Sequence, residues 1–223
     1  TDLPEFDAGA HVDVLVDADQ KLVRQYSLCG PSQDRSRYRL GILLEPASRG
    51  GSGRMHAVAK GDLVRISPPR NRFCVASDAR RHVLIAGGVG ITPLLAMSHE
   101  LRALDADWEM HYCARSPDDA AFADELDGDP RVTFHFDDGP PDRRLAVEKD
   151  VGPPRNDTAL YVCGPGGFMD FVVTAAAKVG WDSSSIHLER FAPSEADAES
   201  APGDAFVVRL ARSGQEFVVP ATE

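Results

Sequence analysis

The chain has 223 residues, of which 43% are hydrophobic, so it can form one large domain or two of about 100 residues each. Its 35 acidic and 24 basic residues give a formal net charge of -11, which argues against nucleic acid as a partner because phosphate binding needs a basic surface. Since no apolar run approaches the roughly 20 residues of a membrane span and the first residues show no signal peptide, we expect a cytoplasmic protein with no membrane contact.

Short strands separated by glycine and proline are predicted in the first third of the chain. The expected strands are residues 11–16, 22–28, 38–45 and 62–67, with one short helix at 50–58. Several short strands at such spacing are typical of an antiparallel barrel or sandwich. We therefore expect residues 1–78 to form an antiparallel β-barrel domain.

From residue 79 onward the pattern becomes strand–helix–strand. Apolar strands are expected at 82–86, 108–114, 131–136, 159–163 and 185–189, and helices at 92–104, 118–126 and 165–179. Near-continuous apolar strands that alternate with helices indicate a parallel sheet covered on both faces. Residues 79–191 are thus predicted to be a doubly wound α/β nucleotide-binding domain, which makes the whole an α+β two-domain protein.

The last 32 residues differ again. Residues 192–204 are rich in Pro, Ser, Ala, Asp and Glu and have the composition of a linker. Residues 205–223 predict a hairpin with its turn near Ser213 and Gly214. Because an isolated hairpin is marginal in water, we expect it to begin a further domain.

Two glycine-rich turns each follow a predicted buried strand and open a helix. They are Gly87-Gly88-Val89-Gly90-Ile91-Thr92-Pro93 and Cys163-Gly164-Pro165-Gly166-Gly167. Glycines let a ligand approach the backbone, a helix start offers free N–H groups to a phosphate, and Thr92 is placed to cap its helix. Because ligands of open α/β sheets bind at the carboxyl ends of the strands, we expect both turns to frame one crevice.

Two further motifs lie in the barrel half. In Arg24-Gln25-Tyr26-Ser27-Leu28, the arginine offers a bidentate fork for phosphate and the tyrosine on the same face a surface for a planar ring. In Arg49-Gly50-Gly51-Ser52-Gly53-Arg54, consecutive N–H groups before a short helix are typical of an anion-binding nest. By themselves, both are also compatible with an ordinary strand and a flexible loop.

In this order the four motifs resemble the ferredoxin–NADP reductase superfamily over nearly the whole chain. The Arg-Gly-Gly-Ser form and the trailing hairpin are most similar to the phthalate dioxygenase reductase and vanillate demethylase reductase branch. That resemblance implies bound FMN, NADH as the usual donor, and a C-terminal two-iron two-sulfur ferredoxin domain that passes electrons to an oxygenase or a haem monooxygenase. The cluster cysteines and the first barrel strand of the family are absent from this sequence, so we expect a piece of a longer protein.

The resemblance also implies roles for individual residues. Ser27, Cys163 and Glu189 are the candidates to orient the stacked rings or manage the flavin N5 proton. The FMN site would comprise Arg24, Gln25, Tyr26, Ser27, Arg49, Gly50, Gly51, Ser52 and Phe191. The nicotinamide nucleotide crevice would comprise Gly88, Gly90, Ile91, Thr92, Arg115, Cys163, Gly164 and Pro165. No metal ligand set is expected, because the cysteines and histidines lack ligand spacing.

The choice of nucleotide rests on Arg115, which follows the second parallel strand. An arginine there can accept a ribose 2′-phosphate, whereas Asp118 and Asp119 just beyond it would repel one. We expect NADH, with NADPH as the alternative. Two other interpretations of the whole chain stay open: a free-standing flavin or ferric reductase, and an electron-transfer module without its own hydride chemistry.

Overall fold

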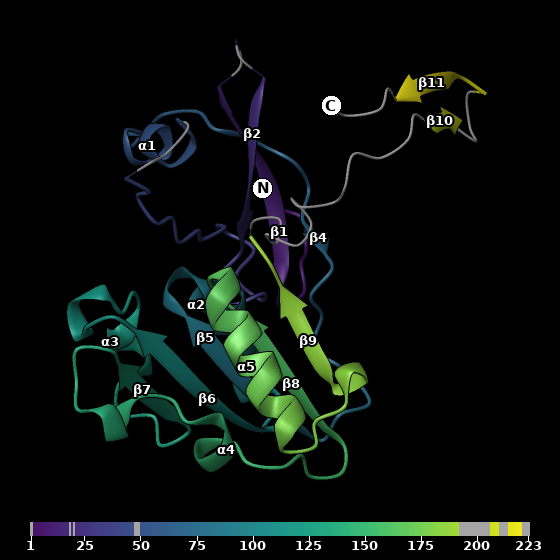
Figure 1. Cartoon of the computed structure of the whole chain (residues 1–223). Helices are drawn as coiled ribbons and strands as arrows, with labels where there is room; N and C mark the ends of the chain where they lie inside the picture. The colour runs from purple at the N-terminus through teal and green to yellow at the C-terminus, as the bar shows by residue number, and fades with distance from the viewer. Residues whose placement is uncertain are drawn as a thin grey trace. The chain divides into compact units, whose positions relative to one another are not determined.

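The computed structural model describes residues 2–17, 19, 21–46, 50–191, 206–209 and 214–219. The chain divides into two compact units, Thr1–Phe191 and Ala192–Glu223. The larger unit contains an antiparallel sheet followed by a parallel one (Figure 1). The two-domain fold class predicted from the sequence is confirmed.

The antiparallel sheet is built around β1 (Ala10–Asp17), which pairs with β2 (Leu22–Ser27), β3 (Arg65–Ile66) and β4 (Arg70–Asn71). The short helix α1 (Gly51–His56) contacts β1 and β2. The small core of this sheet consists of Ala10, Val12, Val14 and Leu28.

The strand predicted at 38–45 is wrong. Only Leu40 forms a bridge, to Leu28, and the described residues on either side of it join no strand. The segment packs against the parallel-sheet half instead, since a Cβ placed on Gly41 would lie 2.6 Å from Cγ2 of Thr92. Leu43 and Leu44 remain 53% and 54% exposed, so these two side chains of the apolar run are not buried by strand pairing. The strand predicted at 62–67 is shortened to β3.

The parallel sheet has five strands in the order β7-β6-β5-β8-β9. They are β5 (Arg81–Gly87), β6 (Asp107–Ala114), β7 (Val132–Phe136), β8 (Thr158–Cys163) and β9 (Ile186–Glu189). Helix α5 (Gly166–Lys178) covers one face and α2 (Ile91–Ala103) the other (Figure 1). The strand order reverses between β5 and β8, so the sheet is doubly wound with its switch point there.

The helix predicted at 118–126 is broken. A 3₁₀ turn, η2 (Pro117–Asp119), and a single α turn, α3 (Ala123–Leu126), are separated by residues 120–122, of which Phe122 has a left-handed φ of 62°. With this backbone conformation the Phe122 ring packs against the core. The Arg39 guanidinium lies over the same ring, 4.5 Å from its centroid. Tertiary contacts thus outweigh local helix propensity. The remaining short elements are η1 (Gly88–Gly90), η3 (Pro141–Arg143), α4 (Val147–Asp150) and η4 (Ser183–Ser185).

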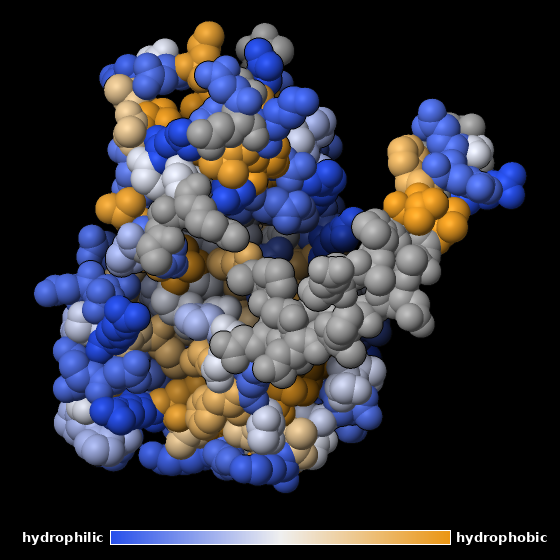
Figure 2. Space-filling model, turned by 45° about the horizontal axis from the view of Figure 1, so that its top comes forward, coloured by the Kyte–Doolittle hydropathy of each residue, from blue (hydrophilic) through white to orange (hydrophobic). Residues whose placement is uncertain are grey.

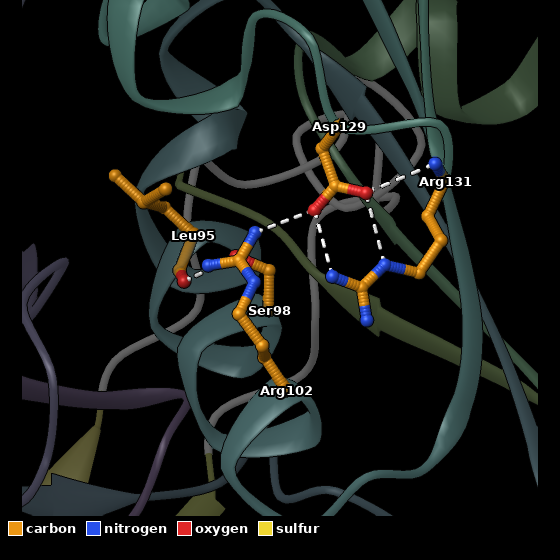
Figure 3. A network of polar contacts seen from close by, with 5 residues as sticks. All are labelled: Leu95, Ser98, Arg102, Asp129 and Arg131. Atoms are coloured by element: carbon orange, nitrogen blue, oxygen red, sulfur yellow. Dashed lines mark hydrogen bonds and ion pairs between the residues drawn. The ribbon is translucent and has the colours of Figure 1, made fainter.

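A carboxylate anchors the end of α2 that lies away from the glycine-rich turns. Asp129 accepts hydrogen bonds from Arg102 on α2, at 2.8 Å, and from the side chain of Arg131, at 2.8 and 2.9 Å (Figure 3). Both guanidinium groups also lie over Trp108, at 5.6 and 4.5 Å from its ring. These bonds hold the pKa of Asp129 well below its usual range, the contribution of Arg131 being the largest.

The smaller unit contains β10 (Phe206–Arg209) and β11 (Glu216–Val219), which pair antiparallel as predicted. Gly214, at the predicted turn, has a φ of 69°. Ser213 and the predicted linker 192–204 lie outside the described residues, and the domain boundaries stay predictions.

Figure 2 shows hydrophilic residues around the margins of the parallel-sheet half and hydrophobic ones gathered toward its centre. Over the described ranges, no helix is long and apolar enough to cross a membrane. Nor do these ranges contain three or more His, Cys, Asp or Glu residues placed to hold a metal ion.

Candidate flavin and nucleotide site

The two glycine-rich turns lie against each other at the switch point of the parallel sheet. A Cβ placed on Gly90 would lie 2.2 Å from the carbonyl oxygen of Cys163, and one on Gly164 would lie 3.1 Å from Cα of Gly87. Neither turn therefore tolerates a side chain at its contact with the other. The structure brings the predicted crevice residues together from both turns.

One of these residues acts differently from the prediction. Helix α2 begins at Ile91, so Thr92 lies inside the first turn and is not the N-cap. Its hydroxyl donates instead to the carbonyl of Val89, at 3.1 Å. Thr92 is 2% exposed, and Gly90 and Ile91 are buried too, so Gly88 and Val89 are the half-buried residues of this turn.

A cavity of about 240 Å³ lies where the antiparallel sheet meets the end of β9. Its lining residues are His11, Gln25, Ser27, Arg72, Phe73, Leu188, Glu189, Arg190 and Phe191. At its centre the Ser27 hydroxyl donates to Oε2 of Glu189, at 3.0 Å. Two residues that are 162 positions apart in the chain thus form one polar pair.

The ionisation of this pair is set by burial. Burial raises the pKa of Glu189 to about 7, and the hydrogen bond from Ser27 opposes the shift. A carboxyl group with such a pKa exchanges a proton near neutral pH. Burial also raises the pKa of Cys163, which favours the protonated thiol at neutral pH.

Two of the predicted phosphate-binding residues, Arg24 and Gly51, lie in contact where β2 meets α1. The side chain of Arg24 lies over the start of α1, so that a Cβ on Gly51 would come within 2.9 Å of its Nε. The hydroxyl of Ser52 accepts from the N–H of Glu45, at 3.1 Å. Among the described residues, no carboxylate forms an ion pair with Arg24. Arg49 lies outside the described residues.

Three predicted site residues have surroundings that differ from those expected. The Gln25 amide lines the cavity but donates to Asp13, at 3.0 Å. Tyr26 packs against the core of the antiparallel sheet. Arg115 is exposed at the end of β6, beyond the two glycine turns.

Several cavity residues had no sequence signal. His11 is paired with Ser27 across the strands, and Arg72 and Phe73 follow β4. Phe168 was also missed, although its ring would lie 2.7 Å from a Cβ on Gly87 and 2.8 Å from one on Gly164. An aromatic residue in the first turn of the helix, opposite paired glycines, is the one pattern that could have revealed this packing.

Comparison with known proteins gives consistent results. Residues 63–186 match the family described as the N-terminal domain of dimethylamine monooxygenase subunit DmmA-like proteins. The chain is 46% identical to the vanillate O-demethylase oxidoreductase of Pseudomonas putida over 226 residues, which is 99% of this chain and 70% of the relative.

Two solved structures show the same fold. Phthalate dioxygenase reductase, described as a modular structure for electron transfer from pyridine nucleotides to [2Fe-2S], matches with a TM-score of 0.80 and 36% identity, over 99% of this chain and 68% of that one. An intact type IV self-sufficient cytochrome P450 monooxygenase matches with a TM-score of 0.84 and 35% identity, over 99% of this chain but 28% of that one.

The structure joins an antiparallel sheet to a doubly wound one, with the Ser27–Glu189 pair between them and the glycine-lined crevice at the switch point. Together with the similar structures, these features define an NAD(P)H-linked flavin reductase of the ferredoxin–NADP reductase superfamily. Within that class, the chain belongs to the family of the vanillate O-demethylase oxidoreductases and phthalate dioxygenase reductase. The family resemblance predicted from the motifs is confirmed, and so is its class of enzyme, the oxygenase reductases.

Proposed function

We propose that this chain binds FMN and NADH, moves a hydride from the nicotinamide to the flavin, and passes the electrons on singly through an iron–sulfur domain to an oxygenase. The observation that carries the proposal is the Ser27–Glu189 pair, which joins the predicted flavin strand to the edge of the nucleotide sheet at 3.0 Å. When bound, the flavin supplies the chemistry that converts a two-electron donor into single electrons. The chain itself supplies orientation, exclusion of water and proton control.

The residues present fit a flavin mononucleotide. Arg24 is half-buried beside Gly51, with no ion-pair partner among the described residues, and an arginine in such a position suits the doubly charged phosphate of FMN. The cavity offers the hydroxyl of Ser27, at the end of the strand that carries Arg24, and the carboxyl group of Glu189, at the end of β9. Phe191, which is 49% exposed at the cavity rim, is placed to cover a planar ring.

The residues of the crevice position the nicotinamide. Gly88 and Val89 are half-buried just before α2, where the helix dipole favours a pyrophosphate. The close contact between Gly90 and the Cys163 carbonyl keeps this turn beside the end of β8. Ser27 and Glu189 hold a proton beside the expected position of flavin N5 and release it near neutral pH.

The charges around the end of β6 favour NADH over NADPH. Four carboxylates follow the carboxyl ends of β6 and β7 in the sequence, namely Asp118, Asp119, Asp137 and Asp138. Over residues 115–119 and 137–144 as a whole there are five carboxylates, Asp142 being the fifth, against three basic side chains, Arg115, Arg143 and Arg144. Ser116 already donates to Asp119, at 2.7 Å. A ribose 2′-phosphate placed there would meet net negative charge, which disfavours it.

The proposed acceptor is an oxygenase. Relatives are named for vanillate O-demethylation, carnitine monooxygenation and phthalate dioxygenation, and one similar structure is fused to a cytochrome P450. We propose that the hairpin β10–β11 begins a two-iron two-sulfur domain in the full-length protein and that this domain delivers the electrons. On this proposal the cysteines that hold the cluster follow Glu223 in the full-length protein.

The proposal is tested by identifying the cofactor and comparing the two donors. Flavin released by heat should be FMN, and kcat/KM for NADH should exceed that for NADPH. Arg24→Ala should lower flavin occupancy at least tenfold, with Arg37→Ala, an exposed arginine paired with Asp34, as the matched control. A colourless protein, or full flavin occupancy in Arg24→Ala, contradicts the assignment.

A further inference from the structure

Two histidines form a buried, hydrogen-bonded pair under the loop that follows β7. Nδ1 of His111, on β6, lies 3.0 Å from Nε2 of His135, on β7, and the two rings are stacked with centroids 5.3 Å apart. Both side chains are 6% exposed. Nδ1 of His135 lies 3.1 Å from the carbonyl oxygen of Arg143. The pair therefore connects two strands of the sheet to the loop 137–146.

The partners fix where the hydrogens are. A carbonyl oxygen only accepts, so Nδ1 of His135 carries a hydrogen and, in the neutral ring, Nε2 of His135 accepts from Nδ1–H of His111. Nε2 of His111 then carries no hydrogen, and no described residue offers this buried atom a hydrogen bond. A proton added to His111 goes to its Nε2, where the new N–H has no acceptor among the described residues. A proton added to His135 goes to its Nε2, so the hydrogen on Nδ1 of His111 must move to Nε2 of His111, with the same result. The arrangement is thus suited to two neutral rings.

The loop that His135 holds also braces the nucleotide edge of the sheet. The N–H of Asp137 donates to the carbonyl of Ala114, at 3.1 Å, and the N–H of Asp138 to the carbonyl of Arg115, at 3.0 Å. These bonds tie the start of the loop to the end of β6. In a doubly wound sheet, the end of the second strand receives the ribose of the adenosine half of a dinucleotide.

We propose that the His111–His135 pair is a clasp that positions the loop 137–146 and the end of β6 for the adenosine half of the nicotinamide nucleotide, and that protonation of the pair opens it. The histidines act as positioning residues and do not touch the reacting atoms. The inference rests on the proposed function, because it requires that a nicotinamide dinucleotide binds at this edge.

The surrounding charges determine the direction of the pH effect. Burial lowers the pKa of His111 to about 4, with a further lowering by His135, and Asp150 of α4 opposes both. Burial lowers the pKa of His135 too, against the Arg143 carbonyl and Asp150. Cys113, on the same face of β6, stays a neutral thiol because burial raises its pKa to about 12. When the loop is open and the rings are in water, their pKa returns to the ordinary 6.5. The clasp is therefore complete above pH 6.5 and is lost as the pH falls toward 4.

The experiment compares two donors on the full chain with its flavin bound. NADH has an adenosine half, whereas reduced nicotinamide mononucleotide lacks it. His135→Leu removes the bonds at both ring nitrogens and should raise KM for NADH about five- to tenfold, which corresponds to one or two lost hydrogen bonds. KM for the mononucleotide and kcat with either donor should change less than twofold. Should this variant fail to bind flavin, His111→Leu tests the same clasp from the other strand.

The conservative variant is His111→Asn, whose amide keeps the donor at the place of Nδ1 but does not titrate. It should keep KM for NADH within twofold of the wild type at pH 7.5. Because His135 remains and still titrates, the ratio of KM for NADH to KM for the mononucleotide should rise less between pH 7.5 and 5.5 in this variant than it does in the wild type. The clasp is overturned if the leucine variants change KM equally for both donors, or if neither of them changes KM for NADH. A wild-type protein that oxidises neither donor refutes the proposed function instead.

Discussion

The half-buried carboxyl group of Glu189 makes a quantitative prediction about stability. Burial raises its pKa from an ordinary 4.5 to about 7, so the folded state binds this proton more tightly than the unfolded chain does. The group therefore costs nothing below pH 4.5 and destabilises the fold increasingly as the pH rises to about 7. The full cost corresponds to about 3 kcal/mol above pH 7.

Replacing this residue by its neutral isostere removes the cost. Glu189→Gln should be more stable than the wild type by up to about 3 kcal/mol at pH 8, and equally stable near pH 4.5. The assay is urea unfolding of the flavin-depleted protein at both pH values, followed by tryptophan fluorescence. Glu148→Gln on α4, where the side chain is exposed, is the matched control and should show no such difference. A gain that is the same at both pH values, or below about 0.5 kcal/mol at pH 8, would refute the reasoning.

Three further predictions concern the crevice, the helix anchor and the rim of the cavity. Gly90→Ala should lower the rate of flavin reduction by NADH at least tenfold with flavin occupancy retained, because the added Cβ would lie 2.2 Å from the Cys163 carbonyl; an unchanged stopped-flow rate would contradict the packed crevice. Asp129→Asn should lower the free energy of unfolding by about 2 kcal/mol at pH 7. Since the pKa of Asp129 is held low in the folded state, this difference should shrink as the pH falls below 3.8, and a difference in urea titrations that stays constant with pH would count against the anchor. Phe191→Ala should weaken flavin binding in equilibrium dialysis, and an unchanged Kd would remove this residue from the ring site.

Much of the parallel-sheet half could be predicted from the sequence. Its strands are buried on both faces and therefore appear as unbroken apolar runs, as in Thr158–Cys163, where every residue is buried. The two glycine-rich turns were recognisable because their position after a strand and before a helix has a physical reason. Both lie at the predicted edge of the sheet and touch.

The errors have a common cause in contacts between distant segments. The run at 38–45 looks like a strand, but its pairing is replaced by packing on the other half of the unit. The helix at 118–126 is interrupted because Phe122 takes a left-handed backbone to place its ring in the core. Periodicity describes single elements and contains no information about such contacts.

The candidate site was predicted only in part, for the same reason. Ser27 and Glu189 were named separately, through resemblance, but the 3.0 Å bond between them depends on how the two sheets pack. The His111–His135 pair was missed entirely, since its two members are 24 residues apart and adjacent only through the register of β6 and β7. Scattered histidines in a sequence do not show which of them meet.

The most direct test of hydride transfer, the central claim, is anaerobic titration of the purified chain with NADH, followed at the flavin absorbance. We predict that about one NADH per flavin bleaches the absorbance, and that NADPH does so at least tenfold more slowly. A bound flavin that neither donor bleaches would contradict hydride transfer, whatever the identity of the final electron acceptor.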